Sequence, residues 1–168
     1  MAEEETAAAA AAPTEEQVQQ QFVMQRIYAK DLSFESPASP NVFKKQWQPQ
    51  ISVDLNTKSE KIGDDNFEVV LTVTITAKLE EETAFLVEVQ QAGIFLIQGI
   101  EGDNLRRVLA TAAPNILFPY ARENIDAVCV KGGFPPVMLA PVNFDALFQQ
   151  AVAQAQNQAA EGGESATH

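Results

Sequence analysis

The residue types that most often carry out catalysis are sparse in this chain. Among 168 residues there is one histidine, His168, and one cysteine, Cys129. A base-activated serine or cysteine nucleophile needs a histidine held beside it, and the last residue of a polar terminal segment is not held in that way. The single cysteine excludes an internal disulfide and a cysteine-rich metal site, and we expect it to be buried on a helix. These residues predict neither a nucleophilic enzyme nor a metalloenzyme.

Carboxylates and basic residues give no stronger sign of a catalytic or nucleic-acid site. The pair Asp64-Asp65 and the run 80–82 lie in segments of turn composition, where adjacent acids are normally solvated charge. The chain has no glycine-rich phosphate loop, G-x-S-x-G elbow or H-E-x-x-H motif. Basic residues are sparse, and Arg106-Arg107 is the only pair of arginines in the part expected to fold, which disfavours a nucleic-acid groove. We therefore expect an interaction protein rather than an enzyme, with no cofactor and no bound metal.

The charge balance narrows the class of partner. Eleven basic residues against 23 acidic ones give a formal charge of -12 and a pI near 4.4. Such a chain repels phosphate backbones and anionic membranes, and it attracts partners with a basic patch. The N-terminus lacks the basic region of a signal peptide, and no apolar stretch approaches the length of a membrane span. The sequence predicts a cytoplasmic protein with no stable membrane binding.

Composition divides the chain into one domain and two tails. Residues 1–21 are rich in Ala, Glu and Gln, and residues 159–168 are polar with a glycine pair. Neither segment can bury enough apolar surface to offset the entropy of ordering, so we expect both tails to be disordered. Residues 22–158 form a single domain that is long enough for a sizeable core.

The first half of that domain has the period of β-strands. In residues 66–79 every odd position from Phe67 to Leu79 is apolar, while the even positions are mostly Thr, Glu and Lys, as in a half-buried antiparallel strand. Turn signals at 63–66 and 80–82 give two hairpin-length links. The proline-bearing link after the first strand, with one short helical turn, is long enough to cross over. The expected strands are 22–35, 51–56, 66–79 and 83–97.

The second half has helical periodicity. Residues 103–112 and 114–131 suit two helical pieces, and Pro119 inside the second predicts a kink or a fresh start. Asn143 is a suitable N-cap for a last helix, and Asp145 in its first turn favours the helix dipole. The expected fold class is α+β: a four-stranded antiparallel sheet with a crossover connection and helices packed on one face.

Five colinear segments resemble the SecB family of bacterial protein-export chaperones. They are YAKDLSFESP (28–37), WQP (47–49), ETAFLVEVQQ (82–91), PNILFPYARE (114–123) and LAPVNFDALF (139–148). The similarity runs in order from about Phe22 to Phe148, and the main departure is the basic pair Arg106-Arg107. It implies an ATP-independent homotetramer, a dimer of dimers. Such a tetramer holds unfolded preproteins and delivers them to the SecA translocation ATPase.

The resemblance also implies three sets of site residues. It assigns Asp31, Glu35, Leu86 and Glu88 to SecA binding, and alternation independently places Asp31 with Glu35, and Leu86 with Glu88, on shared strand faces. We expect client binding at apolar residues of the connector and the second strand, although such a stripe is also typical of core. The inward face of strand 83–97 looks longer than two short helical segments can cover, which predicts a subunit contact there. The client residues are Phe43, Trp47, Ile51, Val53 and Leu55, and the tetramer-interface residues are Val87, Val89 and Gln91.

Two other functions stay open on the sequence alone. The same fold and motifs would suit a dedicated SecB-like chaperone of a toxin–antitoxin system, in which one specific client replaces many. An aromatic cleft around Trp47 would suit a small-ligand binding protein. General export is favoured because the surface of acidic residues and Leu86 would have no use in either alternative.

Overall fold

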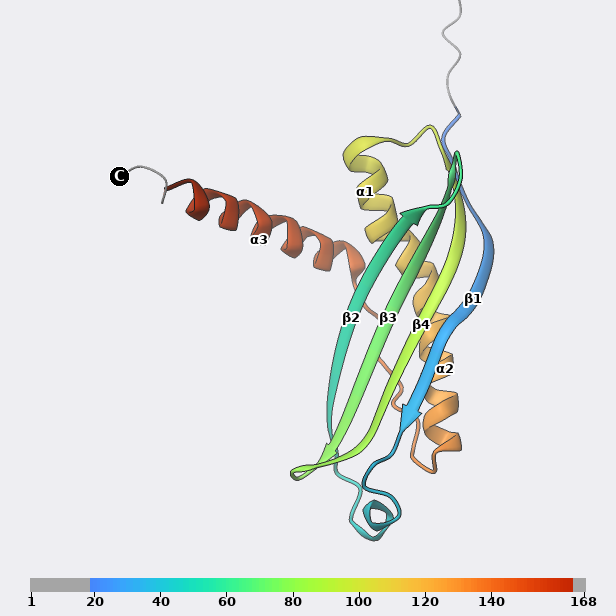
Figure 1. Ribbon diagram of the computed structural model, residues 1–168, viewed down its shortest axis with the longest axis vertical. Coiled ribbons are helices and arrows are strands. Elements are labelled where there is room, and N and C mark those ends of the chain that lie inside the picture. Colours follow the sequence, from blue (N-terminus) through green and yellow to red (C-terminus); the bar gives the residue numbers. More distant parts are fainter. Residues whose placement is uncertain (1–18, 165–168) are drawn as a thin grey trace, which may run out of the picture.

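The computed structural model describes residues 19–164, with side chains up to residue 159. Most of the expected N-terminal tail and His168 lie outside the described residues. The core of the molecule is a four-stranded antiparallel sheet with the order β1-β4-β3-β2 (Figure 1). Its strands are β1 (Gln21–Glu35), β2 (Gln50–Lys61), β3 (Asn66–Leu79) and β4 (Glu82–Gln98).

The sheet order confirms the predicted crossover. β1 and β2 follow one another in the chain but form opposite edges of the sheet. Their connection contains the expected helical turn, η1 (Asn41–Lys44). β2 continues five residues past the predicted end at Asn56, because it pairs with β3 along its full length, as far as Lys61 opposite Phe67. Sequence alternation missed this part because Thr57–Lys61 is polar, as an edge strand tolerates.

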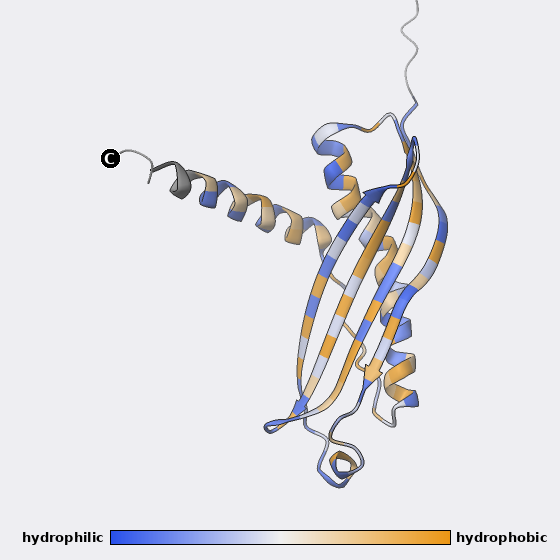
Figure 2. Cartoon of the chain, in the orientation of Figure 1, coloured by the Kyte–Doolittle hydropathy of each residue, from blue (hydrophilic) through white to orange (hydrophobic). Residues whose placement is uncertain are grey.

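The alternation of residue types decides which side of the sheet is buried. Every odd residue of β3 from Phe67 to Leu79 is buried, and the even residues are half-buried or exposed. Figure 2 shows the result as alternating hydrophobic and hydrophilic bands along the strands. Side chains of period two point to opposite faces, so the sheet has an inner face toward the helices and an outer face without helices.

Two helices cover the inner face. α1 (Gly102–Ala110) and α2 (Ala112–Lys131) are separated by Thr111, whose backbone leaves the helical region at φ -124 and ψ -64. α2 packs mainly on β4 and β3 and buries Leu117, Ala121 and Ile125, together with Cys129 as predicted. The helix starts before Pro119 and continues through it, so a fresh start, one of the two predicted alternatives, does not occur; the other alternative, a kink, stays a prediction. The α+β fold class is confirmed.

The last helix, α3 (Phe144–Glu164), projects away from the sheet (Figure 1). Asn143 caps it as predicted, because its Oδ1 accepts a hydrogen bond from the Ala146 N–H at 3.0 Å. Phe144 packs edge-on against Phe118 of α2, and Asp145 pairs with Arg107 of α1 at 3.0 Å. α3 also continues past Ala159, where the sequence predicts a polar tail; the last four residues lie outside the described part of the chain.

Candidate partner and client surfaces

The outer face of the sheet carries the acidic residues predicted to meet a partner. Strand pairing places Glu35 of β1 opposite Leu86 of β4, and Ser33 opposite Glu88. Side chains of directly paired residues in antiparallel strands point to the same side of the sheet. Asp31 is two residues before Ser33 and shares this side. The pairing therefore brings Asp31, Glu35, Leu86 and Glu88 together.

The neighbouring strands extend this surface. Thr74 of β3 is paired with Glu88, and Asp54 of β2 is paired with Thr74. The Thr74 hydroxyl donates a hydrogen bond to Glu88, with 3.2 Å between Oγ1 and Oε2. This bond orients the half-buried Glu88 carboxylate in the middle of a row that ends at Asp54. We call Asp31, Glu35, Asp54, Leu86 and Glu88 the acidic face.

A second polar cluster lies nearer the other end of the outer face, and sequence reasoning did not find it. The Glu68 carboxylate accepts hydrogen bonds from the Tyr28 hydroxyl and from Lys30, whose Nζ lies 2.9 Å from Oε2. Burial, followed by the bond to Glu68, raises the pKa of Tyr28 to about 12. The Lys30 and Tyr28 bonds hold the pKa of Glu68 below its usual value. The cluster ties β1 to β3 across β4, and the outward position of Glu68 in the alternation was its only sequence signal.

The apolar residues of β2 form an exposed stripe on the inner face. Ile51 and Val53 are 41% and 43% exposed, and Leu55 is partly buried. They are paired with Ala77, Ile75 and Val73 of β3, whose side chains are fully buried. The difference arises because α2 lies over β4 and β3 and leaves this edge strand uncovered. We call Ile51, Val53 and Leu55 the β2 stripe.

The other two predicted client residues belong to an aromatic cluster. Phe134, directly after α2, lies 5.2 Å from Trp47, 5.1 Å from Phe43 and 5.0 Å from Phe85, measured between ring centroids. Phe34 also stacks on Phe85 at 5.8 Å. Phe134 is buried, while Phe43 is 53% exposed and Trp47 is partly buried. We call these five residues the aromatic cluster.

The glycine pair after α2 lets this cluster close. A Cβ on Gly132 would stand 2.2 Å from the Phe34 ring, and Gly133 has φ +84, which favours glycine. The Phe134 N–H donates to the Cys129 carbonyl at 2.9 Å, which folds the chain back over the end of the helix. In the sequence the glycine pair indicates only the end of a helix, and no local pattern points to Phe134 as the centre of the cluster.

The reasoning that placed a subunit contact on β4 was wrong in one respect. Val87 and Val89 are fully buried and Gln91 is 3% exposed within a single chain, because α2 is 20 residues long and covers this part of the strand. Gln91 bonds inside the chain as well: its Nε2 donates to the Tyr28 carbonyl, and its Oε1 accepts from Asn124, both at 2.9 Å. These side chains offer no free surface to a neighbour, and their assignment to a tetramer interface stays a prediction.

Two other kinds of site are absent from the described residues. Within residues 19–164, no three His, Cys, Asp or Glu side chains lie close enough together to hold a metal ion. Among the helices in this range, none has the length and apolar character needed to span a membrane.

Comparison with known proteins decides the family. The family model of the preprotein translocase subunit SecB matches residues 15–155. The protein-export protein SecB of Hahella chejuensis is 57% identical over 147 residues, covering 88% of this chain and 92% of its own. That of Marinobacter nauticus is 57% identical over 153 residues, covering 90% and 93%. The chain belongs to the SecB family.

A solved structure agrees with this assignment at the level of the fold. A SecB-like chaperone of Mycobacterium tuberculosis, solved with a peptide from an antitoxin, has a TM-score of 0.56 at 15% identity. The match covers 73% of this chain and 88% of the other. Membership of the SecB family confirms the predicted function as a chaperone of protein export. It also favours this function over a chaperone dedicated to one toxin–antitoxin pair, since the close relatives are export proteins.

Proposed function

We propose that this SecB chain is an ATP-independent holdase of the cytoplasm that keeps precursor proteins unfolded and hands them to the SecA ATPase. In this proposal the β2 stripe and the aromatic cluster bind the client, the acidic face binds SecA, and the working unit is a homotetramer. The observation that carries the proposal is that the β2 stripe and the acidic face lie on opposite faces of one sheet. A client and a partner on opposite faces do not compete for the same atoms.

The inner surface suits clients of varied sequence. Unfolded chains share apolar side chains and a free backbone but no fixed pattern of polar groups. Ile51 and Val53 offer exposed aliphatic area along an extended strand, and Phe43 adds an exposed aromatic ring at one end. Several such weak contacts, repeated on the subunits of an oligomer, add through effective concentration. This surface therefore supports capture of many unfolded segments rather than recognition of one.

The outer surface suits a basic partner. Asp31, Glu35, Asp54 and Glu88 contribute four carboxylates around the half-buried Leu86. A partner with basic side chains around an apolar residue would match both the charge and the apolar centre. Charges of this kind mainly raise the association rate and the specificity, and their effect falls with salt. Transfer from client capture to translocation would then begin with a salt-sensitive encounter.

The test is the formation of a complex of three components. The full chain is mixed with a signal-bearing precursor diluted from urea and with SecA, and the mass of the complex is measured in solution. We expect one species that contains the chaperone, the precursor and SecA, and a chaperone mass of four chains before the additions. The same precursor in its folded state is the control and should not bind. Mutual exclusion of SecA and precursor would contradict the proposal.

A further inference from the structure

The β2 stripe leads into a cavity at the other end of the strand. The inward-facing positions of β2 continue past Leu55 to Thr57 and Ser59, which pair with Leu71 and Val69 of β3. There the strand meets α1, and a cavity of about 320 Å³ lies between them. It is lined by Thr57, Ser59, Gly102, Leu105, Arg106, Leu109 and Ala110.

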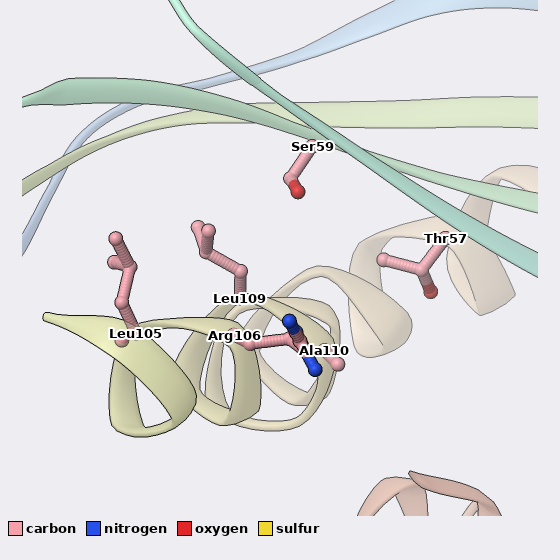
Figure 3. Close-up of a pocket in the computed structure, with 7 residues that line it drawn as sticks. Thr57, Ser59, Leu105, Arg106, Leu109 and Ala110 are labelled. Atoms are coloured by element: carbon pink, nitrogen blue, oxygen red, sulfur yellow. The ribbon is translucent and has the colours of Figure 1, made fainter. Parts of the chain in front are cut away.

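The cavity has an apolar side and a polar side. Leu105 and Leu109 extend from α1 toward β2, and the Ser59 hydroxyl points toward α1 (Figure 3). Arg106 lies along α1 beside Ala110, at the rim (Figure 3). A ligand group in this cavity would therefore meet aliphatic side chains, the hydroxyls of β2 and one guanidinium. An acidic side chain has the matching parts: methylene groups for the aliphatic wall and a carboxylate for the donors.

The guanidinium of Arg106 has only a weak intrachain partner. It lies 3.6 Å from the Asp103 carboxylate, and the two side chains are 74% and 96% exposed. An exposed pair of this kind holds neither group firmly. The next residue behaves differently, because Arg107 is hydrogen-bonded to Asp145 at 3.0 Å and fastens α3 to α1. Of the two neighbouring arginines, Arg106 is therefore the one placed to bind a carboxylate from outside.

We propose that this cavity is a subsite that takes the carboxylate of an Asp or Glu in an extended client. The inference rests on the proposed function, because the client must already lie along the β2 stripe. From Val53 to Ser59 the strand advances by roughly 20 Å, at about 3.4 Å per residue. The acid in the client would therefore lie about six residues from the apolar side chain that contacts Val53. In a chain of net charge -12, Arg106 offsets the general repulsion of acidic clients at this point.

The test uses labelled peptides that differ at one position. Each is extended and otherwise uncharged, with a central leucine–valine run and Glu, Gln or Lys six residues away, on either side of the run. Fluorescence anisotropy with the full chain gives Kd. We expect the better-placed Glu peptide to bind about fivefold tighter than its Gln counterpart, the order of one partly exposed ion pair. Arg106→Gln should remove this preference, and the matched control Arg107→Gln should keep it.

The outcomes separate this inference from the proposed function. Suppose that the Gln peptide binds, that its binding depends on the β2 stripe, and that the Glu peptide binds no more tightly. The inference is then wrong and the proposed function stands. A Glu preference that persists in Arg106→Gln overturns it equally. If the Gln peptide does not bind, or binds independently of Ile51, Val53 and Leu55, both proposals fail.

The chain's own acidic N-terminal segment is the competing occupant. Residues 1–18 contain five glutamates, so a full-length variant with all five changed to Gln is measured with the same peptides. An unchanged preference for Glu over Gln supports the assignment to a client. A preference that exists only in this variant would assign the cavity to the N-terminal segment and contradict the proposal. The five residues are Glu3, Glu4, Glu5, Glu15 and Glu16.

Discussion

At the scale of single residues, Phe134 connects the end of α2 to the crossover connection. Its ring is 5% exposed and contacts Trp47, Phe43 and Phe85. Phe134→Ala removes the centre of the aromatic cluster, so we expect a loss of about 3–5 kcal/mol in the free energy of unfolding. Urea denaturation measures this loss. Phe43→Ala, at a residue that is 53% exposed, is the control; equal losses in the two variants would contradict a central role for Phe134.

The acidic face is tested by reversing charge at two of its residues. Glu35→Lys with Glu88→Lys removes two attractions for a basic partner and adds two repulsions. We expect SecA binding to weaken at least about tenfold, which corresponds to about 1.4 kcal/mol, because exposed pairs are individually weak and act together. Calorimetry against SecA measures the change, and capture of an unfolded precursor should stay near that of the unchanged chain.

The control reverses two exposed acids elsewhere, Glu60→Lys with Asp64→Lys. This variant has the same net charge as the first but keeps the acidic face intact. An equal loss of SecA affinity would mean that overall charge, rather than this face, attracts the partner.

At the scale of elements, β2 carries different surfaces on its two sides. Changing Ile51, Val53 and Leu55 together to Ala removes apolar area from the inner side, so we expect weaker capture of an unfolded precursor and nearly unchanged SecA binding. The matched control is Ser52→Ala with Asn56→Ala, on the outer side of the same strand, which should leave capture intact. Calorimetry with both ligands checks the pair. A stripe variant that loses SecA binding first would contradict the assignment of the two surfaces.

The cluster around Glu68 joins β1 to β3, and its contribution depends on pH. The pKa of Glu68 is lowered in the folded state from the usual 4.5 by the bonds from Lys30 and Tyr28. The stabilisation is therefore complete above pH 4.5 and is lost as the pH falls through the lowered value. We expect Glu68→Gln to reduce the melting temperature at neutral pH, and the difference from the unchanged chain to narrow in acid. Glu60→Gln, at the exposed residue opposite Glu68, should have a small effect at both pH values.

Elements with regular patterns were predictable from the sequence, and contacts between distant segments were not. The odd residues of β3 and the cap at Asn143 are local signals, and the structure places both as expected. The polar end of β2 was missed because its strand state depends on pairing with β3, which no local pattern records. The cover over Val87 was missed for a similar reason: the two helical segments were judged too short to cover the strand, although α2 packs along β4.

The candidate site follows the same rule. Alternation within β1 and within β4 placed Asp31 with Glu35 and Leu86 with Glu88, but only the register between the strands joins the two pairs. The exposure of Ile51 and Val53 depends on where α2 lies across the sheet. The cluster of Phe134 with Trp47 needs the chain to turn back at Gly132 and Gly133. Each of these is a long-range contact.

At the scale of the whole molecule, one chain leaves apolar surface without cover. On α2, Tyr120 is 46% exposed and Val130 is 57% exposed, and on α3 Leu147 and Val152 are 43% and 38% exposed. The sheet packs on the other side of α2 and so does not cover Tyr120 or Val130, and α3 projects away from the sheet (Figure 1). The proposed homotetramer would cover such surface, since obligate contacts are large and mostly apolar. From this exposed surface we expect subunits to meet at the helical layer, a placement that competes with the contact predicted on β4.

Two substitutions distinguish this placement from a contact on β4. Val130→Asp adds a charge at an exposed position, which a single chain tolerates, but burial of an unpaired charge in a subunit contact is costly. We therefore expect this variant to keep its melting behaviour as a folded chain while its mass shifts from tetramer toward dimer. Val89→Asp places the same charge in the core of one chain, where the side chain is fully buried, and should unfold the chain rather than separate subunits. Sedimentation at low micromolar concentration, with circular dichroism on the same samples, measures both effects. The control is Ile62→Asp, at an exposed apolar residue in the turn between β2 and β3. The opposite result would contradict this placement. If Val89→Asp stays folded but forms dimers, while Val130→Asp stays tetrameric, the subunit contact lies on β4, because only a contact there is broken by a charge at Val89 and unaffected by one at Val130.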